Sequence, residues 1–498
     1  MTDAPVVTTF SGPVRGVWRG HGTPEASAAF LGIPFAKPPV GDLRFAAPAP
    51  PEFWSDERDC TEYGATALRV TGSDTLIPEP AIAGESTLNV NVFTPALDGS
   101  LPVLVWIHGG GYTEGSPASP WYDGSAFNRD GVVTVSLSYR LGFDGFGYIE
   151  NAPHNRGVLD WIAALEWVQQ NIASFGGDPG RVTIGGQSAG GGAVLTLLGM
   201  PQVQHLFHAA MSFSGAIADI PRETARRRGQ RLATLGGVEP DVDGLRGLSE
   251  RRIRQLQPKA ATPRAGVRMV LDLLAGGLPW GPMVDGDLIP RPTVESLESG
   301  IGADKPLLLG ATDDEFTMVA VEHGRHARLV PPGLLLMPFL RHARTRRAYL
   351  AANREQCAKG SAAMVGRFVS DDIFRSLVPR VAQARSEADA ATWTYRFSWV
   401  SPTKGWACHC LDVPFWFDGL GRERVAALAG PHPPQPLADE MHAAAVAMIV
   451  DGDPGWPAWR TDPGTTRVFG DTAGRVVTAD AYDSTLALVV RPSPTDAG

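Results

Sequence analysis

The chain has 498 residues, of which 43% are hydrophobic and 19% charged, a composition typical of globular proteins. Its formal net charge is −9 and its pI is about 5.7, which argues against a nucleic-acid partner, because phosphate binding needs a basic face. The apolar run LLLMPFL at 334–340 is too short to span a bilayer.

The N-terminus and the cysteines bear on the cellular compartment. The first residues contain no basic segment followed by an apolar one, so no secretory signal is predicted. The four cysteines are too few for a disulfide framework in a chain of this length. We therefore expect a soluble, cytoplasmic protein with no membrane partner. The cysteines are Cys60, Cys357, Cys408 and Cys410.

Apolar, β-branched runs alternate with helical patterns along the chain. Residues 157–172 place apolar side chains in a helical stripe. Near-continuous apolar strands separated by helices indicate a parallel sheet covered on both faces. We expect one α/β domain over residues 1–498 with a helical cap, and ligands bound at the carboxyl ends of the strands. The expected strands are 101–107, 132–139, 182–184, 209–215, 306–311, 392–399 and 465–470.

Three glycines follow the first of these strands, in VWIHGGGY at 105–112. Successive glycines let backbone N–H groups converge on one point and leave room for a substrate. Loops of this type supply oxyanion donors in lipases and esterases. We expect this loop, together with the N–H of Ala189, to stabilise a tetrahedral intermediate.

A single serine lies among glycines in RVTIGGQSAGGG at 181–192. On a sharp strand-to-helix turn, Gly186 and Gly190 would relieve crowding, so that Ser188 stands at the edge of the sheet. A flexible glycine loop has the same composition, so this motif alone does not decide between the two readings.

A serine nucleophile needs a base, and the base needs an orienting carboxylate. In α/β hydrolases the order along the chain is serine, acid, histidine. The segment PLLLGATDDEFTM at 306–318 places Asp313, Asp314 and Glu315 directly after an expected strand. Three adjacent acids also make an ordinary polar loop, so this position is only suggestive.

Several histidines follow the acidic segment. His409 lies among small and aromatic residues in GWACHCLDVPFWF at 405–417, where a base and a core histidine are equally plausible. His432, among prolines, and His442, on an expected helix, look structural. Cys408 and Cys410 flank His409, but neighbouring side chains point apart, and we predict no metal. The remaining downstream histidines are His323, His326 and His342.

The glycine loop, the serine, the acids and a histidine occur in the order of a serine hydrolase. The chain also closely resembles the type-B carboxylesterase (carboxylesterase/cholinesterase) family of α/β hydrolases, and within it the bacterial p-nitrobenzyl-esterase-like members. The resemblance runs nearly end to end. It is carried by residues 30–54, 155–191, 282–290 and 451–459.

The resemblance implies an α/β-hydrolase fold, with a large, mostly parallel central sheet covered by helices and with a helical cap or insertions. It implies a serine carboxylesterase that hydrolyses carboxylic esters of small to medium apolar or aryl substrates through an acyl-enzyme. No metal or cofactor is implied, and the protein is expected to be a monomer or homodimer.

The resemblance also implies residue roles. Ser188 matches the nucleophile, Glu315 the acid and His409 the base. Ser214 matches a serine close behind the triad. A structural ion pair is implied for Arg44 and Glu85, and oxyanion donors for Gly110, Gly111 and Ala189.

Three departures from the family pattern affect the site. Gln187 replaces the usual glutamate before the nucleophile, and Phe316 replaces the usual glycine after the acid. Ala67 and Thr87 stand where the family has a disulfide, which fits a reducing compartment. The loop between them contains no aromatic residue for cation–π binding of quaternary ammonium, so a choline ester is not the expected substrate.

Two alternatives share this sequence pattern. A carbamate or amide hydrolase would use the same triad, and a binding or scaffold protein would retain a vestigial site. Five aromatic residues flank the catalytic segments and either line an apolar substrate pocket or pack in the core. They are Trp106, Trp121, Phe316, Phe415 and Trp416.

Overall fold

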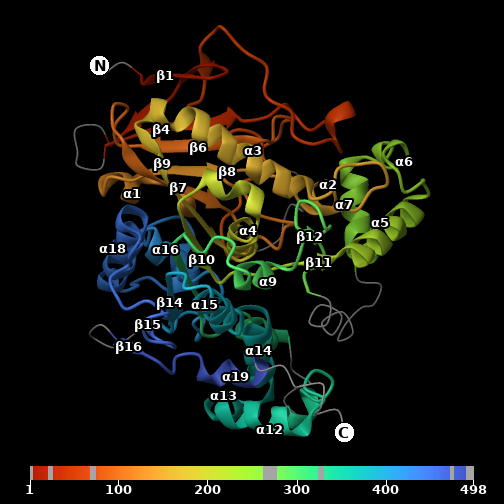
Figure 1. Cartoon of the computed structure of the whole chain (residues 1–498), viewed down its shortest axis with the longest axis vertical. Helices are drawn as coiled ribbons and strands as arrows, with labels where there is room; N and C mark the ends of the chain where they lie inside the picture. The colour runs from red at the N-terminus through yellow and green to blue at the C-terminus, as the bar shows by residue number, and fades with distance from the viewer. Residues whose placement is uncertain are drawn as a thin grey trace.

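A large mixed β-sheet runs through the computed structural model and is covered by helices (Figure 1). The structure describes residues 4–20, 26–67, 75–261, 277–323, 330–470 and 476–489. The strands are β1 Val6–Thr9, β2 Gly12–Arg15, β3 Val17–Arg19, β4 Ser27–Pro34, β5 Arg58–Asp59, β6 Asn89–Thr94, β7 Leu101–Ile107, β8 Val133–Leu137, β9 Gly177–Gln187, β10 Ala209–Phe213, β11 Ile220–Pro221, β12 Met283–Val284, β13 Leu307–Thr312, β14 Thr392–Phe397, β15 Thr466–Phe469 and β16 Val476–Thr478.

The helices lie between and beyond these strands. They are α1 Ser125–Arg129, α2 Gly142–Phe146, α3 Arg156–Asn171, α4 Ala189–Leu198, α5 Arg222–Gly236, α6 Val242–Arg246, α7 Glu250–Ala261, α9 Thr293–Glu298, α10 Thr317–His323, α11 Pro332–Leu335, α12 Ala343–Ala352, α13 Arg354–Ala358, α14 Ser361–Ser370, α15 Leu377–Glu387, α16 Val413–Trp416, α17 Val425–Ala429, α18 Gln435–Asp451 and α19 Leu486–Val489. Among the described residues, none of them has the length and apolarity needed to cross a membrane.

Within the described residues the central sheet has 11 strands in the order β16-β15-β14-β13-β10-β9-β7-β8-β6-β4-β3. From β15 to β8 every neighbouring pair is parallel, and antiparallel strands complete both edges. The expected mostly parallel sheet is therefore confirmed. The carboxyl ends of its parallel strands meet at one edge, where ligands bind in open α/β sheets.

The apolar runs of the sequence became the inner strands because both faces of the sheet are covered. In β7, Val105 and Ile107 pack into one hydrophobic cluster, and Trp106 packs into another on the opposite face. Helix α3 buries Val158, Trp161 and other residues against the first cluster. Helix α18 covers the second cluster.

The N-terminal strands β4 and β6 were not predicted from the sequence. Strand β6 carries two buried asparagines, Asn89 and Asn91, whose side-chain amides bond backbone and serine oxygens. Their polar side chains interrupt the apolar pattern from which strands were inferred. The expected helical insertions are present: α5, α6 and α7 follow β10, and α10 to α15 follow β13.

Candidate active site

A sharp turn between β9 and α4 carries Ser188. Its backbone angles are φ 59° and ψ −123°, a region that a residue with a side chain occupies only when its surroundings impose it. A Cβ atom on Gly190 would lie 2.0 Å from the carbonyl oxygen of Ile107, and one on Gly186 would lie 2.5 Å from the backbone of Gly190. The two glycines therefore permit this turn, and the segment forms the expected sharp strand-to-helix turn.

The hydroxyl of Ser188 lies next to His409. Its Oγ is 3.0 Å from Nε2 of His409, and Nδ1 of the same ring makes a short hydrogen bond to Oε2 of Glu315. The other oxygen of Glu315 accepts a hydrogen bond of 2.9 Å from the N–H of Thr312. The backbone N–H of His409 also donates a hydrogen bond of 2.9 Å to the backbone carbonyl oxygen of Glu315. Three residues distant in sequence thus form a serine–histidine–carboxylate chain.

The two neighbouring acids have other partners. Asp313 makes a bidentate ion pair with Arg396, at 2.6 and 2.8 Å. Asp314 pairs with Arg367 at 3.0 Å. Of the three adjacent acids, Glu315, which the family resemblance had selected, is the one that contacts His409.

The other candidate histidines lie elsewhere. His442 is buried, with Nδ1 2.8 Å from the carbonyl oxygen of Trp416 and Nε2 3.0 Å from Asp130. His342 and His432 are exposed. The side chain of His323 and all of His326 lie outside the described residues.

The protonation of His409 depends on opposing effects. Burial by itself disfavours the imidazolium, but the neighbouring Cys410 sulfur and Glu315 carboxylate outweigh it, and the pKa of His409 is raised well above 6.5. Burial also raises the pKa of the Cys410 thiol, which is therefore neutral near pH 7. We accordingly assign the rise mainly to Glu315, which stabilises the imidazolium.

The glycine loop after β7 lies against the serine turn. A Cβ on Gly109 would be 3.1 Å from the Cβ of Ser188. Gly110 and Gly111 have φ of 107° and 59°. Within the described residues, the N–H groups of Gly110 and Gly111 donate no hydrogen bond. The N–H of Ala189, the first residue of α4, has no acceptor within its helix.

Gln187 and Ser214 lie beside and behind this group. The side-chain nitrogen of Gln187 is 3.2 Å from Nε2 of His409, and the residue is buried. Ser214 directly follows Phe213, whose carbonyl oxygen accepts the N–H of Ser188 at 2.9 Å. The Ser214 hydroxyl is buried and makes no hydrogen bond to any part of the chain that the structure describes.

Two phenylalanine rings flank His409. Phe316 stacks on the imidazole, and Phe374 tilts against it, each with a ring-centroid distance of 4.9 Å. Phe316 is partly exposed, whereas the four tryptophan and phenylalanine residues grouped with it in the sequence are buried in the core. Sequence reasoning missed Phe374, because it lies on a π-helical turn, Asp371–Arg375, without a recognisable motif.

Asp412 was also missed. It is buried, and its Oδ2 accepts hydrogen bonds from the Tyr395 hydroxyl at 2.8 Å and from Nε1 of Trp416 at 3.2 Å. Burial raises the pKa of Asp412 to about 6, and the nearby charge of Glu315 adds to the rise. Asp412 thereby anchors the segment that carries His409. In the sequence, the signal that could have identified Asp412 was its position three residues after His409.

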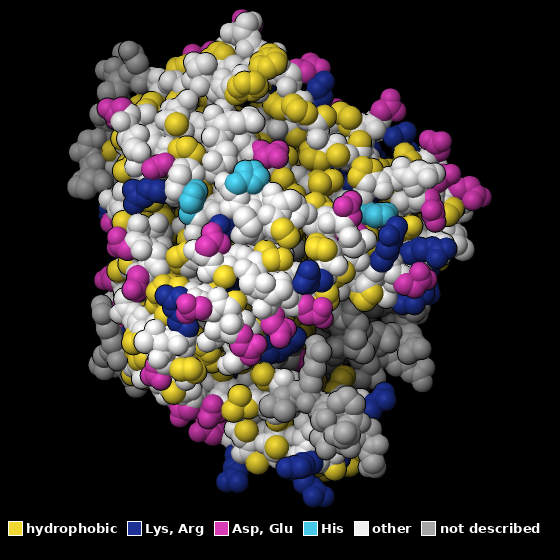
Figure 2. Space-filling view, in the orientation of Figure 1, with side chains coloured by type: hydrophobic (Ala, Val, Ile, Leu, Met, Phe, Trp, Pro, Cys, Tyr) yellow, Lys and Arg dark blue, Asp and Glu magenta, His cyan; other side chains and the backbone are white. Residues whose placement is uncertain are grey.

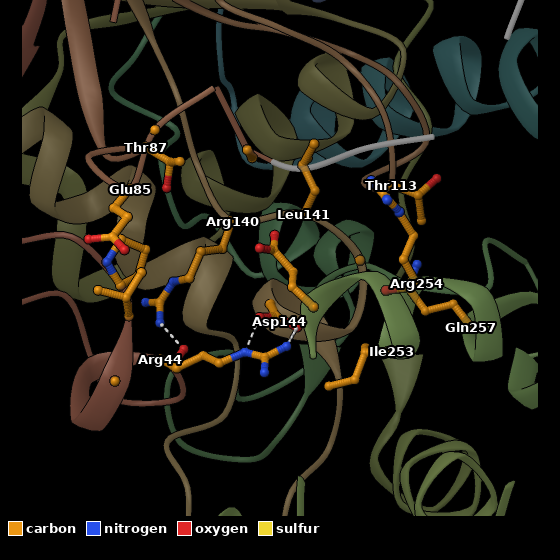
Figure 3. A pocket seen from close by; sticks show the side chains of 17 residues that line it. Arg44, Glu85, Thr87, Thr113, Arg140, Leu141, Asp144, Ile253, Arg254 and Gln257 are labelled. Atoms are coloured by element: carbon orange, nitrogen blue, oxygen red, sulfur yellow. Dashed lines mark hydrogen bonds and ion pairs between the residues drawn. The ribbon is translucent and has the colours of Figure 1, made fainter. Parts of the chain in front are cut away.

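The prediction of an ion pair between Arg44 and Glu85 was wrong. Arg44 pairs instead with Asp144 at 2.9 Å and donates to the carbonyl oxygen of Leu248. Both Arg44 and Glu85 line a cavity of about 310 Å³, which Thr113 and Arg254 also line (Figure 3). The acidic partner of Arg44 lies 100 residues away in sequence, on α2, so no local pattern could reveal it.

The cysteines are unpaired. Cys60, Cys408 and Cys410 are buried, and Cys357 is partly buried. Within the described residues no three histidine, cysteine or acidic side chains gather in a way that could hold a metal ion.

Comparison with known proteins bears on the chemistry of this site. The family model described as "Carboxylesterase family" matches residues 3–427. The para-nitrobenzyl esterase of Bacillus subtilis (strain 168) is 34% identical over 93% of this chain and 94% of its own length. The fumonisin B1 esterase of Sphingopyxis macrogoltabida is 33% identical over 95% and 88%. A solved carboxylesterase from Geobacillus stearothermophilus superposes with a TM-score of 0.80 at 31% identity, covering 97% of this chain and 99% of the other.

Proposed function

This chain belongs to the carboxylesterase family, with its α/β-hydrolase fold, and we propose that Ser188, His409 and Glu315 carry out its hydrolysis of carboxylic esters. The observation that carries the assignment is the continuous contact from the Ser188 hydroxyl through the His409 ring to the Glu315 carboxylate. A carbamate or amide hydrolase, which would use the same residues, is not favoured by relatives that are named as esterases.

The first half of the reaction forms an acyl-enzyme. Neutral His409 accepts the proton of Ser188 through Nε2 while Oγ attacks the ester carbonyl carbon. Glu315 holds the other ring nitrogen and stabilises the imidazolium. His409 then gives the proton to the leaving alcohol as the carbon–oxygen bond breaks. In the second half, water attacks the acyl-enzyme with His409 again as base.

The negative charge that develops on the carbonyl oxygen needs donors that have no other acceptor. Within the described residues the N–H groups of Gly110 and Gly111 donate no hydrogen bond, the N–H of Ala189 has no acceptor in its helix, and Gly109 of the same loop lies against Ser188. We therefore assign the oxyanion to these three N–H groups. The buried Ser214 hydroxyl is assigned a supporting position behind the triad.

The substrates proposed for this site are esters of small to medium apolar or aryl groups. Phe316 and Phe374 present apolar rings next to the catalytic histidine. We also propose that residues 1–498 form one domain, because the central sheet takes strands from both ends of the chain. A cytoplasmic location accords with four unpaired cysteines, and we expect a monomer or homodimer.

The decisive experiment is the intact mass of the wild type and of Ser188→Ala after reaction with an organophosphate, alongside turnover of a p-nitrophenyl ester series. We expect one adduct and turnover in the wild type and neither in the variant. Ser214→Ala, a buried serine without a proposed nucleophilic role, is the matched control and should still be labelled. An adduct on Ser188→Ala, or no adduct on the wild type, would refute the assignment.

A further inference from the structure

A basic and apolar surface lies at one end of the molecule, remote from the N-terminal strands. It is formed by residues 334–347, the end of α11, the following turn and the first half of α12 (Figure 1). We name it the α11–α12 surface. Residues 330–354 contain five arginines, one histidine and no acidic residue, although the whole chain carries −9. The charge of this segment is therefore opposite in sign to the net charge of the whole chain.

Its arginines are exposed and unneutralised. Arg341, Arg344 and Arg347 are exposed, and within the described residues none of them forms an ion pair. Arg344 and Arg347 are three residues apart, on one face of α12. They lie in its first turns, where the helix dipole disfavours positive charge, and no acid occupies the first turn. Helix stability therefore does not account for this arrangement.

Apolar side chains face solvent beside these arginines. Leu334 is 58% exposed and Met337 is 51% exposed, and they are three residues apart on the same side of the α11 turn. Figure 2 shows yellow and dark-blue side chains next to each other at this lower end of the molecule. Both residues belong to the apolar run LLLMPFL, whose exposure the catalytic site does not explain.

The surface is nevertheless well anchored. Leu336, between the two exposed residues, is fully buried in a small cluster with Tyr349, Met364 and Phe368. Arg346 donates to the carbonyl oxygen of Leu340 at 2.6 Å and fixes the turn between α11 and α12. The outward direction of Leu334 and Met337 is thus part of the fold.

We propose that the α11–α12 surface binds the surface of a bilayer that contains anionic phospholipid. Exposed arginines attract anionic headgroups, and Leu334 and Met337 would enter the boundary between headgroups and acyl chains. A polyanion such as nucleic acid would use the arginines but not the aliphatic side chains of Leu334 and Met337. The contact proposed here is peripheral and needs no membrane-spanning helix, although the sequence predicted no membrane partner.

The test is co-sedimentation of the full chain with vesicles of phosphatidylcholine alone or mixed with phosphatidylglycerol. We expect binding only to the mixed vesicles, and weaker binding as salt is raised, because charges are screened beyond about 8 Å at physiological ionic strength. Replacing Arg341, Arg344 and Arg347 with Gln should weaken binding roughly 100-fold. Replacing Leu334 and Met337 with Ser should weaken it about 10-fold or more.

Two matched controls separate this site from general charge and apolarity. Replacing Arg222, Arg226 and Arg227 of α5 with Gln removes the same charge from another exposed helix and should leave binding unchanged. Replacing Phe10 and Phe53, an exposed ring pair, with Ser should also have no effect. Turnover of a water-soluble ester should be unchanged in all four variants, which verifies that they are folded.

Three results would overturn the proposal. The first is no binding to the mixed vesicles even at low salt. The second is an equal loss of binding in the α5 control. The third is binding to double-stranded DNA as tight as binding to the vesicles and unaffected by the Leu334 and Met337 changes, which would mark a general polyanion surface.

Discussion

The ring of Phe316 stacks on the imidazole of His409, with centroids 4.9 Å apart and planes inclined by 28°. Phe316 directly follows Glu315, so the proposed acid and the ring that covers the proposed base come from one short segment after β13. This segment therefore orients His409 in two ways, through a hydrogen bond and through a ring contact.

Phe316→Ala should lower kcat/KM about 2- to 10-fold, because a stacked aromatic contact contributes about 0.5–1.5 kcal/mol. Its partial exposure also predicts an altered preference among acyl lengths and aryl esters. Steady-state kinetics on a p-nitrophenyl ester series measure both effects. Phe53→Ala, at an exposed ring far from the triad in sequence, serves as the control. An unchanged chain-length and aryl profile would remove Phe316 from the substrate pocket.

Glu315→Gln should lower kcat by about 10³- to 10⁴-fold, because an amide cannot hold the required tautomer of His409 or stabilise its imidazolium. Asp314→Asn changes the adjacent acid, which pairs with Arg367, and should reduce stability while leaving kcat of the folded enzyme within about 10-fold. Kinetics at saturating ester, with folding checked by circular dichroism, separate the two. A larger kcat loss in Asp314→Asn than in Glu315→Gln would reverse the assignment of the acid.

The acid limb of kcat/KM should have its midpoint above pH 6.5, because the pKa of His409 is raised and a protonated base cannot accept the Ser188 proton. Gln187→Glu should move this midpoint about 1 pH unit or more upward, since a carboxylate 3 to 4 Å from the ring favours the imidazolium. Activity at neutral pH then falls in the variant. Gln187→Met, of similar size and uncharged, should leave the midpoint in place. Coincident pH profiles for the Glu and Met variants would disprove the electrostatic role of position 187.

Local chemistry made much of the proposed site predictable. The runs that became β7, β10, β13 and β14 are largely apolar because they are buried on both faces, and each was placed within two residues at either end. β9 was also found, but it begins at Gly177, five residues before the expected strand. The turn at Ser188 was predictable because a side chain at Gly190 would collide with Ile107, a constraint that only glycine satisfies. These signals are carried by a few consecutive residues.

Features that depend on distant contacts could not be read from sequence. The residue pattern of the acidic triplet offered three candidates, and only the family resemblance selected Glu315. The partners that occupy the other two acids, Arg367 and Arg396, come from α14 and β14. Phe374 reaches His409 only through the π-helical turn after α14. Arg44 matched the family pattern but pairs with Asp144, because the acid that lies nearest is set by the packing of α2.

Asp313→Asn should lower the free energy of unfolding at pH 7 by about 3–5 kcal/mol, because it removes the carboxylate that the buried Arg375 and the partly buried Arg396 share. Although burial opposes the charge, Arg396 and Arg375 hold the pKa of Asp313 well below 3.8. A carboxylate whose pKa is lower in the folded state than in the unfolded state stabilises the fold at pH values above its unfolded-state pKa, and this stabilisation is lost as the pH falls below that value. The difference in free energy of unfolding between the wild type and Asp313→Asn should therefore shrink below about pH 4. Urea unfolding followed by tryptophan fluorescence at several pH values measures both quantities. Asp389→Asn, which disrupts an exposed pair with Arg460, should cost no more than about 1 kcal/mol. Equal losses in the two variants would show that the buried cluster beside Glu315 adds nothing to stability beyond a surface ion pair.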